Sequence, residues 1–233
     1  MAFDVSKYQP KGPKPMPVFL LLDVSGSMDG DKIDKLNQAV EDMLRAFAKE
    51  EAEIKVSIIT FGASVDLPME NISAKEASQR WQDQVASGMT PMGSALRIAK
   101  DMIEDKSIVP SRSYRPLAVL VSDGAPNDEW EEPLRAFIHE GRSQKCDRMA
   151  MAIGADADEN VLRQFIEGGT QKEVFHAEDA SDIARFFDFV TMSVTSVAAS
   201  GAAKPAGEKP EAEKSAKNEE TSRQQEASNK DLF

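Results

Sequence analysis

Residues 18–28 read VFLLLDVSGSM, a run of five apolar residues followed directly by the pattern D-x-S-x-S. A run that is apolar at every position is typical of a strand buried on both faces, as in a parallel sheet covered by helices. The pattern then supplies the Asp23 carboxylate and the Ser25 and Ser27 hydroxyls from the turn after that strand. Because alternate residues of an extended segment point the same way, we expect these oxygens to converge and to suit Mg²⁺ or a similar cation. The alternative is a simple turn in which Asp23 or Ser25 caps the next helix.

Strand and helix patterns alternate along the chain as far as residue 197. Continuous apolar runs predict strands, and apolar residues at three- and four-residue steps predict helices. The expected strands are residues 18–22, 54–61, 65–69, 117–121, 148–153 and 173–176, and the expected helices are about 32–49, 95–103, 130–138, 161–166 and 182–197. This alternation predicts an α/β fold with a doubly wound, mostly parallel central sheet flanked by helices, of the Rossmann-like kind.

Composition divides the chain into three parts. Residues 1–15 are polar and rich in proline, and they are expected to form an N-terminal extension to one domain that covers residues 16–197. From residue 198 onward Leu232 and Phe233 are the only large apolar residues. Such a segment cannot bury a core, so we expect residues 198–233 to be a disordered, low-complexity tail.

Charge and cysteine content narrow the class of partner and the compartment. A formal net charge of −12 over 233 residues argues against nucleic acid or an anionic membrane as the main partner. The single cysteine, Cys146, cannot form an intramolecular disulfide, which fits a reducing compartment. No run approaches the 18 apolar residues of a membrane span, and residues 1–17 hold no apolar signal core. The expected location is therefore the cytoplasm.

Two further segments offer oxygen ligands beside those of residues 23–27. Thr90 lies in the loop SGMTP before a predicted helix, and Asp123 is followed by glycine directly after the apolar strand at residues 117–121. Asp23 and Asp123 thus both follow strands of the predicted parallel sheet, and ligands of such sheets lie outside the carboxyl ends of the strands. Each segment also has a simpler interpretation, since Thr90 could cap the helix after Pro91 and Asp123 could belong to a turn.

Acidic residues near these segments are expected to flank the same face, or alternatively to be a solvated rim and helix N-terminal carboxylates. They are Asp29, Asp31, Asp128, Glu129, Glu131 and Glu132. A second acidic group, Asp156, Asp158 and Glu159, does not have the spacing of a Ca²⁺ loop. The start of the helix at residues 161–166 accounts for it better.

The three separated segments together resemble the von Willebrand factor A-type domain with its metal-ion-dependent adhesion site. The pattern of that family is D-x-S-x-S after the first strand, a loop threonine before a central helix, and an aspartate, commonly followed by glycine, after the fourth strand. Asp23, Ser25, Ser27, Thr90 and Asp123 occupy these positions, and the resemblance covers about residues 16–195. It implies that the two serines and the threonine bind Mg²⁺, or else Mn²⁺ or Ca²⁺, directly. The two aspartates would bind the ion directly or through water.

The family resemblance also implies a function. One coordination position of the ion would stay open to an Asp or Glu of a partner protein, so the chain is expected to be a non-enzymatic, Mg²⁺-dependent protein–protein interaction module. The segments PVFLLLDVSGSM, SDGAPNDEW and IGADADENVLRQF are similar to those of bacterial cytoplasmic members of the TerY type. That resemblance implies a role in tellurium resistance or another stress response, with kinases, phosphatases or other stress-response proteins as partners. With a single cysteine, the chain lacks the cysteine-rich zinc-binding tail of some of these relatives.

An enzyme is the alternative class, with the haloacid dehalogenase type of phosphotransferase as the specific candidate. That chemistry requires D-x-D, in which one carboxylate is the nucleophile and the second is the general acid. Ser25 stands where the second aspartate should be. Neither His139 nor His176 lies in a recognisable catalytic signature, and Cys146 has no histidine-containing motif near it. The sequence therefore favours binding over catalysis.

Overall fold

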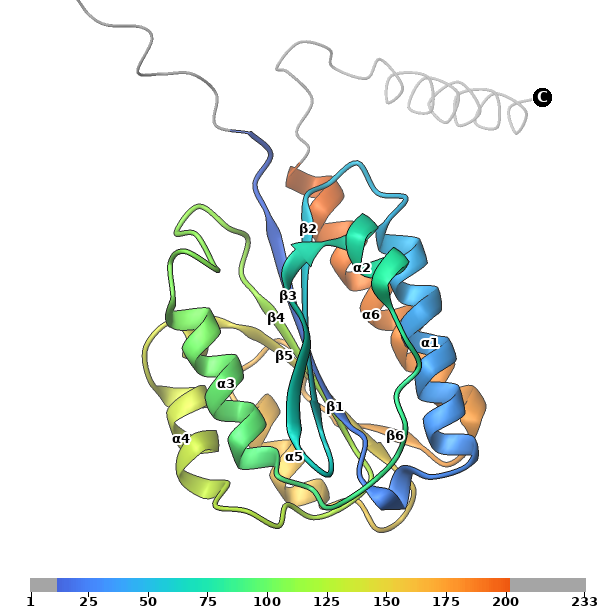
Figure 1. The fold of residues 1–233 in the computed structure, drawn as a ribbon. Coiled ribbons are helices and arrows are strands. Elements are labelled where there is room, and N and C mark those ends of the chain that lie inside the picture. The colour runs from blue at the N-terminus through green and yellow to red at the C-terminus, as the bar shows by residue number, and fades with distance from the viewer. Residues whose placement is uncertain (1–11, 202–233) are drawn as a thin grey trace, which may run out of the picture. The chain divides into compact units, whose positions relative to one another are not determined.

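The computed structural model describes residues 12–201, which form a six-stranded sheet with helices on both faces (Figure 1). The strands are β1 (Met16–Asp23), β2 (Ile54–Phe61), β3 (Val65–Ser73), β4 (Leu117–Ser122), β5 (Asp147–Ile153) and β6 (Phe175–Ala177). The α-helices are α1 (Asp31–Phe47), α2 (Ala74–Arg80), α3 (Met92–Glu104), α4 (Glu131–His139), α5 (Glu159–Ile166) and α6 (Ala180–Gly201). Two short 3-10 helices, η2 (Gly26–Met28) and η3 (Ser143–Lys145), complete the described elements. The predicted α/β class with a doubly wound sheet is confirmed.

The strand order is β3-β2-β1-β4-β5-β6, so β1 and β4 are the central pair. All neighbouring strands are parallel except β2 and β3, which form an antiparallel pair at one edge. Beginning at β1, the chain winds outward to β3 and then returns to the centre at β4. The order of the strands therefore reverses between β1 and β4, and such a switch point is where an open α/β sheet binds ligands.

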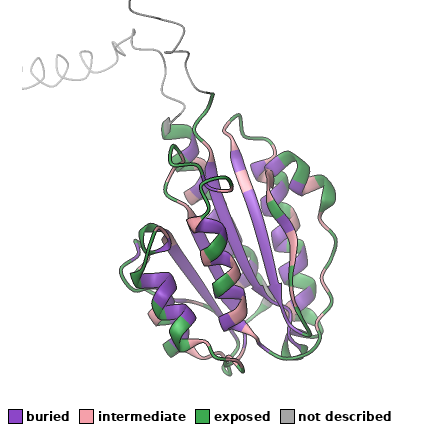
Figure 2. Ribbon diagram, turned by 60° about the vertical axis from the view of Figure 1, so that its left-hand side comes forward, coloured by how far each residue is buried: buried purple, intermediate pink, exposed green. Residues whose placement is uncertain are grey.

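Apolar side chains on both faces of the central strands explain why β1 lacks any alternation of polar and apolar residues. Leu20 and Leu22 pack into a core with α1, α2 and α6, whereas Phe19 and Leu21 pack into a second core with α3, α4 and α5. Figure 2 shows the central strands buried along most of their length, while the helices are buried only on their inner sides. Burial of both faces fixes the register of β1, because a one-residue slip would exchange its two apolar sets.

Three elements differ most from the sequence prediction: β3, α2, and α6, which ends four residues beyond the predicted residue 197. Strand β3 extends to Ser73, beyond the predicted end at residue 69, because its backbone pairs with the edge of β2 although most of its side chains are only half-buried. Helix α2 was not predicted, since it is only seven residues long. Its sequence signal is the capping-box spacing of Ser73 and Glu76, and the Ser73 hydroxyl does accept the backbone N–H of Glu76 at 3.2 Å.

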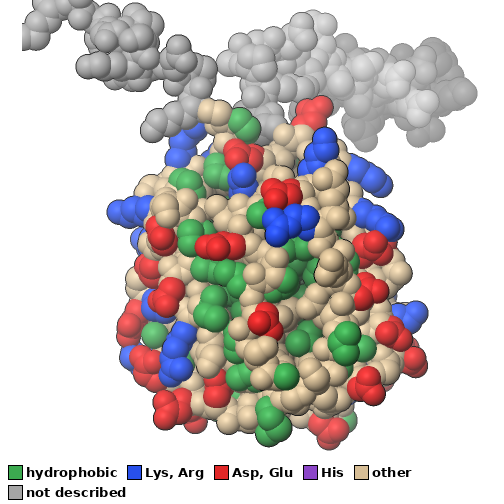
Figure 3. Space-filling model, in the orientation of Figure 1, with side chains coloured by type: hydrophobic (Ala, Val, Ile, Leu, Met, Phe, Trp, Pro, Cys, Tyr) green, Lys and Arg blue, Asp and Glu red, His purple; other side chains and the backbone are tan. Residues whose placement is uncertain are grey.

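The surface on the β3 side carries an apolar strip. Figure 3 shows hydrophobic side chains over the middle of this face, with acidic and basic side chains around them. Val65 and Leu67 of β3 are half-buried and pack against the core that contains α3. Val65 and Leu67 thus belong to the edge strand of the sheet.

Both ends of the described chain lie at the same end of the sheet (Figure 1). Strand β1 starts there and runs towards Asp23, and α6 runs back over 22 residues from the carboxyl ends of the strands. The predicted disordered tail lies outside the described residues, except for its first residues, which belong to α6. No helix among residues 12–201 is long and apolar enough to cross a bilayer.

Candidate metal centre

The two predicted carboxylates come from neighbouring strands at the switch point. Asp23 is the last residue of β1, and Asp123 directly follows β4. Leu22 pairs with Val121 in the parallel register, so the next residue of β4, Ser122, comes to lie beside Asp23. The Ser122 hydroxyl donates a hydrogen bond to Oδ2 of Asp23 at 2.5 Å. Both aspartates are almost completely buried, at 0% and 1% exposure.

The two serines lie beside these carboxylates, although Ser27 reaches its place by a different backbone route from the one predicted. Ser25 is extended, and its N–H donates to Oδ1 of Asp23 at 2.9 Å. Ser27 belongs to the 3-10 helix η2, so the expected extended alternation ends at Ser25. The turn still brings the Ser25 and Ser27 hydroxyl oxygens to 3.0 Å from each other, and Ser27 donates to Oδ1 of Asp123 at 2.7 Å.

Thr90 reaches the same place from the loop before α3. The backbone of this loop binds the serine turn, because the N–H of Gly26 donates to the Gly88 carbonyl at 3.0 Å. Asn127 holds the other side, accepting the N–H of Thr90 at 2.9 Å through its side chain. The Thr90 and Ser27 hydroxyl oxygens both lie within 4.0 Å of the point that a Cβ atom on Gly124 would occupy. Hydrogen bonds therefore link Asp23, Ser25, Ser27 and Asp123, and the Thr90 hydroxyl lies beside the same open position at Gly124 as Ser27.

The helix-capping alternatives do not describe this arrangement. Helix α1 begins after Gly30, and neither Asp23 nor Ser25 caps it. Thr90 does not cap α3 either, since that helix begins after Pro91 and its first N–H groups are held by Asp128. The Asp128 carboxylate accepts the N–H groups of Gly93 and Ser94 at 2.9 and 2.8 Å.

Three of the six flanking acidic residues lie at the starts of helices. Asp128 fixes the start of α3, and Glu131 and Glu132 lie in the first turn of α4, where the helix dipole favours negative charge. In the second acidic group, Asp158 accepts the N–H groups of Asn160 and Val161, so it caps α5 as predicted.

The electrostatics of the centre are unbalanced towards negative charge. Burial raises the pKa of Asp23, while the hydrogen bonds from Ser122 and Ser25 act in the opposite direction. One basic residue, Lys32 of α1, contacts the group: its ammonium lies 2.6 Å from Oδ2 of Asp123 and 3.2 Å from the Ser27 carbonyl oxygen. Two carboxylates therefore share one positive side chain among the described residues that touch the site.

These donors fit a small hard cation. Within residues 12–201 no group of three or more His, Cys, Asp or Glu side chains is placed to hold a metal, so a site here must use hydroxyl oxygens. Neighbouring ligands of an octahedral Mg²⁺ are about 2.9 Å apart, because each lies about 2.1 Å from the ion. The 3.0 Å between the Ser25 and Ser27 hydroxyl oxygens and the 2.7 Å from Ser27 to Asp123 are close to that spacing.

Three residues that support the centre were not predicted. Ser122 and Asn127 hold Asp23 and the Thr90 loop, and Lys32 holds Asp123. Ser122 had a usable signal, because a polar residue at the end of an otherwise apolar strand lies next to the end of the neighbouring strand. Lys32 and Asn127 had no such signal, since their contacts depend on how α1 and the loop after β4 fold over the sheet.

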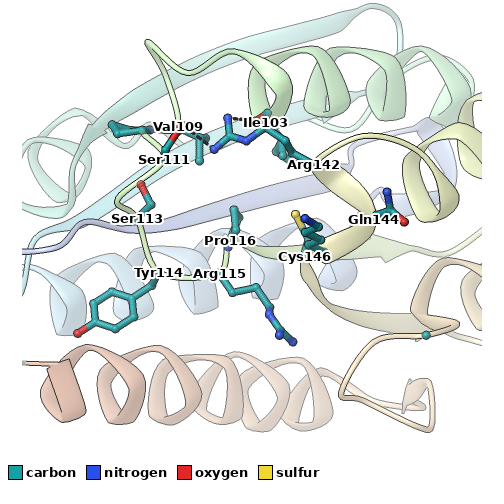
Figure 4. Close-up of a pocket in the computed structure, with 13 residues that line it drawn as sticks. Ile103, Val109, Ser111, Ser113, Tyr114, Arg115, Pro116, Arg142, Gln144 and Cys146 are labelled. Atoms are coloured by element: carbon teal, nitrogen blue, oxygen red, sulfur yellow. Dashed lines mark hydrogen bonds between the residues drawn. The ribbon is translucent and has the colours of Figure 1, made fainter.

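One cavity lined by described residues lies elsewhere and contains no converging carboxylates. It measures about 490 Å³ at the amino ends of β4 and β5, the opposite end of the sheet from Asp23, and Pro116, Arg142 and Cys146 are among its lining residues (Figure 4). The Arg142 guanidinium donates hydrogen bonds to the backbone carbonyls of Ile103, Glu104 and Val109. Burial raises the pKa of Cys146 to about 12, so this thiol is protonated at neutral pH and has a structural role.

Comparison with protein-family models gives one match, to the von Willebrand factor type A domain, over residues 18–189. The matched segment includes all five residues of the candidate centre. No curated protein sequence matches the chain significantly.

Solved structures show the same fold at low identity. A von Willebrand factor type A protein from Catenulispora acidiphila is 18% identical with a TM-score of 0.63, covering 78% of this chain and 43% of its own. Proximal thread matrix protein 1 from the mussel byssus, with a zinc-occupied MIDAS motif, is 15% identical with a TM-score of 0.62, at 77% and 48% coverage. The pilus adhesin SpaC from Lactobacillus rhamnosus GG, in its open conformation, is 15% identical with a TM-score of 0.62, at 81% and 31% coverage. The chain spans less than half the length of each of these proteins.

Proposed function

Because the chain belongs to the von Willebrand factor type A family, whose domains are typically protein-interaction or adhesion modules, we propose that it is a Mg²⁺-dependent, non-enzymatic binding module. Its partner is a protein that presents an Asp or Glu side chain to the ion. The observation that carries this proposal is the convergence of three hydroxyls and two carboxylates from three separate loops at the switch point of the sheet.

Each predicted ligand has a definite task in this proposal. Ser25, Ser27 and Thr90 supply hydroxyl oxygens to the ion, and Asp23 and Asp123 balance its charge either directly or through water. When bound, the ion acts as a Lewis acid that attracts a further carboxylate oxygen. The neutral hydroxyls matter because two carboxylates neutralise a divalent cation without exceeding its charge. A third carboxylate, from the partner, therefore meets a centre that carries no net negative charge to repel it.

Binding is favoured over phosphoryl transfer by what surrounds Asp23. A haloacid dehalogenase needs this aspartate as a free nucleophile and a second aspartate two residues later as the acid. Here Oδ1 of Asp23 accepts the Ser25 N–H and Oδ2 accepts the Ser122 hydroxyl, so both of its oxygens are engaged. Ser25 has no dissociable proton at neutral pH with which to replace the missing acid.

The identity of the ion and the setting complete the proposal. An all-oxygen donor set with close ligand spacing favours Mg²⁺, with Mn²⁺ or Ca²⁺ as the alternatives, although the mussel protein holds zinc in its MIDAS motif. The similarity to TerY-type segments supports a cytoplasmic role in a bacterial stress response such as tellurium resistance. Kinases, phosphatases or other stress-response proteins are then the partners to test first.

A matched pair of serine variants tests the metal site. Ser27 and Ser64 are both exposed, both follow a strand of the sheet, and both donate to a nearby aspartate, at 2.7 Å to Asp123 and 2.5 Å to Asp66. Titration calorimetry with Mg²⁺ and Mn²⁺ is expected to show one site in the wild type and in Ser64→Ala, and an affinity lower by tenfold or more in Ser27→Ala. Equal affinity in the two variants would show that the ion binds elsewhere.

Partner capture then tests the function of the site. Tagged wild type, Ser27→Ala and Ser64→Ala are incubated with bacterial lysate in Mg²⁺ or in EDTA, and the recovered proteins are compared. A partner that needs the centre is retained by the wild type and by Ser64→Ala only in Mg²⁺, and is lost with Ser27→Ala. Recovery of the same proteins under all conditions would contradict a metal-dependent interaction.

A further inference from the structure

The two oxygens of the Asp123 carboxylate have different partners. Oδ1 accepts the Ser27 hydroxyl at 2.7 Å and faces the ring of predicted metal ligands, whereas Oδ2 accepts the Lys32 ammonium at 2.6 Å. The same ammonium donates to the Ser27 carbonyl oxygen at 3.2 Å. Lys32 therefore contacts Asp123 through the carboxylate oxygen that Ser27 does not use, and it contacts the backbone carbonyl of Ser27 rather than its hydroxyl.

The position of this lysine is built into the fold. Lys32 lies in the first turn of α1, directly after the turn that carries Ser25 and Ser27. Its side chain passes Gly154 at the end of β5, where an added Cβ atom would lie 3.8 Å from the ammonium nitrogen. The Asp123 side chain that it contacts is fully buried, while 36% of the Lys32 side chain is exposed. The ammonium can thus act on both the buried carboxylate and a ligand arriving from solvent.

The charge count shows what this ammonium changes. Ionised Asp23 and Asp123 contribute −2, so a divalent cation alone makes the centre neutral, and Lys32 raises the total of the loaded centre to +1. A positive charge beside the ligands opposes the cation and attracts an anion. Because Ser27 holds Oδ1 of Asp123 independently, removing Lys32 changes the charge more than it changes the position of that carboxylate.

We propose that Lys32 is a positioning and charge-setting residue that lowers the affinity of the centre for the divalent ion and raises the affinity of the loaded centre for a carboxylate. The proposal rests on the metal-dependent function described above. It assigns to Lys32 two effects of opposite sign, whereas a purely structural residue would weaken both binding steps when it is replaced.

The test uses Mn²⁺ as the ion and acetate as the carboxylate. Calorimetry gives the Mn²⁺ affinity, and water-proton relaxation reports acetate because it displaces water from the bound Mn²⁺. For Lys32→Met we expect Mn²⁺ to bind about tenfold more tightly and acetate about tenfold more weakly. Lys32→Arg keeps the charge and is expected to resemble the wild type. Lys35→Met, at an exposed position on the same helix, controls for the change in net charge. Acetamide replaces acetate as the neutral control.

The outcomes separate this proposal from the proposed function. If wild type, Lys32→Arg and Lys32→Met all failed to bind Mn²⁺, the metal-dependent function itself would be wrong, and the role of Lys32 with it. If Mn²⁺ bound but Lys32→Met weakened both steps or changed neither, the function would stand and the role of Lys32 would be refuted. Should Lys32→Met not fold without metal, Lys32→Gln, purified and assayed in the same way, gives the same comparison, and the same two results decide it.

Discussion

Replacing Ser122 with alanine should separate the folding and metal-binding roles of the candidate centre. The Ser122 hydroxyl is fully buried and donates to Oδ2 of Asp23 at 2.5 Å. A hydrogen bond to a charged group contributes about 1.5–3 kcal/mol, so we expect the free energy of unfolding in EDTA to fall by about 2 kcal/mol. For a domain of this size that corresponds to a melting temperature lower by roughly 4–8 °C.

Ser57→Ala is the matched control for this variant. Ser57 is a buried serine on β2, on the other side of β1 from β4, and its hydroxyl accepts the N–H of Asn71 at 3.0 Å. This bond joins two neutral groups, and its loss should cost about 1 kcal/mol whether or not Mg²⁺ is present. Urea unfolding of both variants and the wild type, in EDTA and in excess Mg²⁺, gives the comparison.

Excess Mg²⁺ should widen the difference between Ser122→Ala and the wild type. Loss of a residue that holds a metal ligand typically lowers metal affinity by about tenfold or more. At saturating metal each tenfold loss removes about 1.4 kcal/mol of the stabilisation that binding provides. The reasoning would be refuted if Ser122→Ala cost no more than Ser57→Ala in EDTA, or if Mg²⁺ left the cost unchanged.

Three other predictions concern the loops and the interior. Gly88 has φ +78°, and an added Cβ would lie 2.3 Å from the Ala63 backbone, so Gly88→Ala should cost about 2 kcal/mol or more and weaken Mn²⁺ binding. Gly30→Ala also has a positive φ, of +80°, but its Cβ would meet no atom within 4 Å, so it should cost less than Gly88→Ala. Equal urea-unfolding costs would contradict this account. Burial opposes ionisation of Glu104, but hydrogen bonds from the turn after α4 outweigh it and lower its pKa. Above the ordinary pKa of 4.5, Glu104→Gln should therefore have a free energy of unfolding about 1 kcal/mol lower than the wild type in urea. This difference should vanish as the pH falls through the lowered pKa, because the wild-type carboxylate is then protonated too. A difference that stays constant with pH would exclude the carboxylate as its cause. Cys146, with a pKa of about 12, should react with a thiol reagent at pH 8 only after unfolding, and stoichiometric labelling of the native protein within minutes would show that the thiol is accessible.

The central sheet was predictable because its strands can be recognised from their own apolar runs. Residues 18–22 and 117–121 are apolar at every position, which only a strand covered on both faces can accommodate, and both lie within observed strands. Helices with a long apolar stripe, such as α1, were predicted for the same reason, to within two residues at each end. The short helix α2 has too few residues for periodicity to show, and its capping residues were its only local signal.

The candidate centre, too, was only partly predictable from the sequence. Asp23 and Asp123 could be brought together from the sequence because parallel strands place their carboxyl ends at one edge of a sheet, whereas the full set with Ser25, Ser27 and Thr90 followed from the family resemblance. The contacts that hold them depend on facts that no single segment contains. Ser122 meets Asp23 only through the register of β1 and β4, in which the two residues are 99 positions apart in sequence.

The direction of the chain determines how far both ends of the described residues lie from the candidate centre. Met16 begins β1 at the end of the sheet remote from Asp23, and α6 ends at that same end (Figure 1). At 1.5 Å per residue, the 22 residues of α6 span about 33 Å. Both ends of the described chain, residues 12 and 201, are therefore about that far from the candidate centre. The candidate centre therefore lies at the end of the sheet opposite to both ends of the described chain.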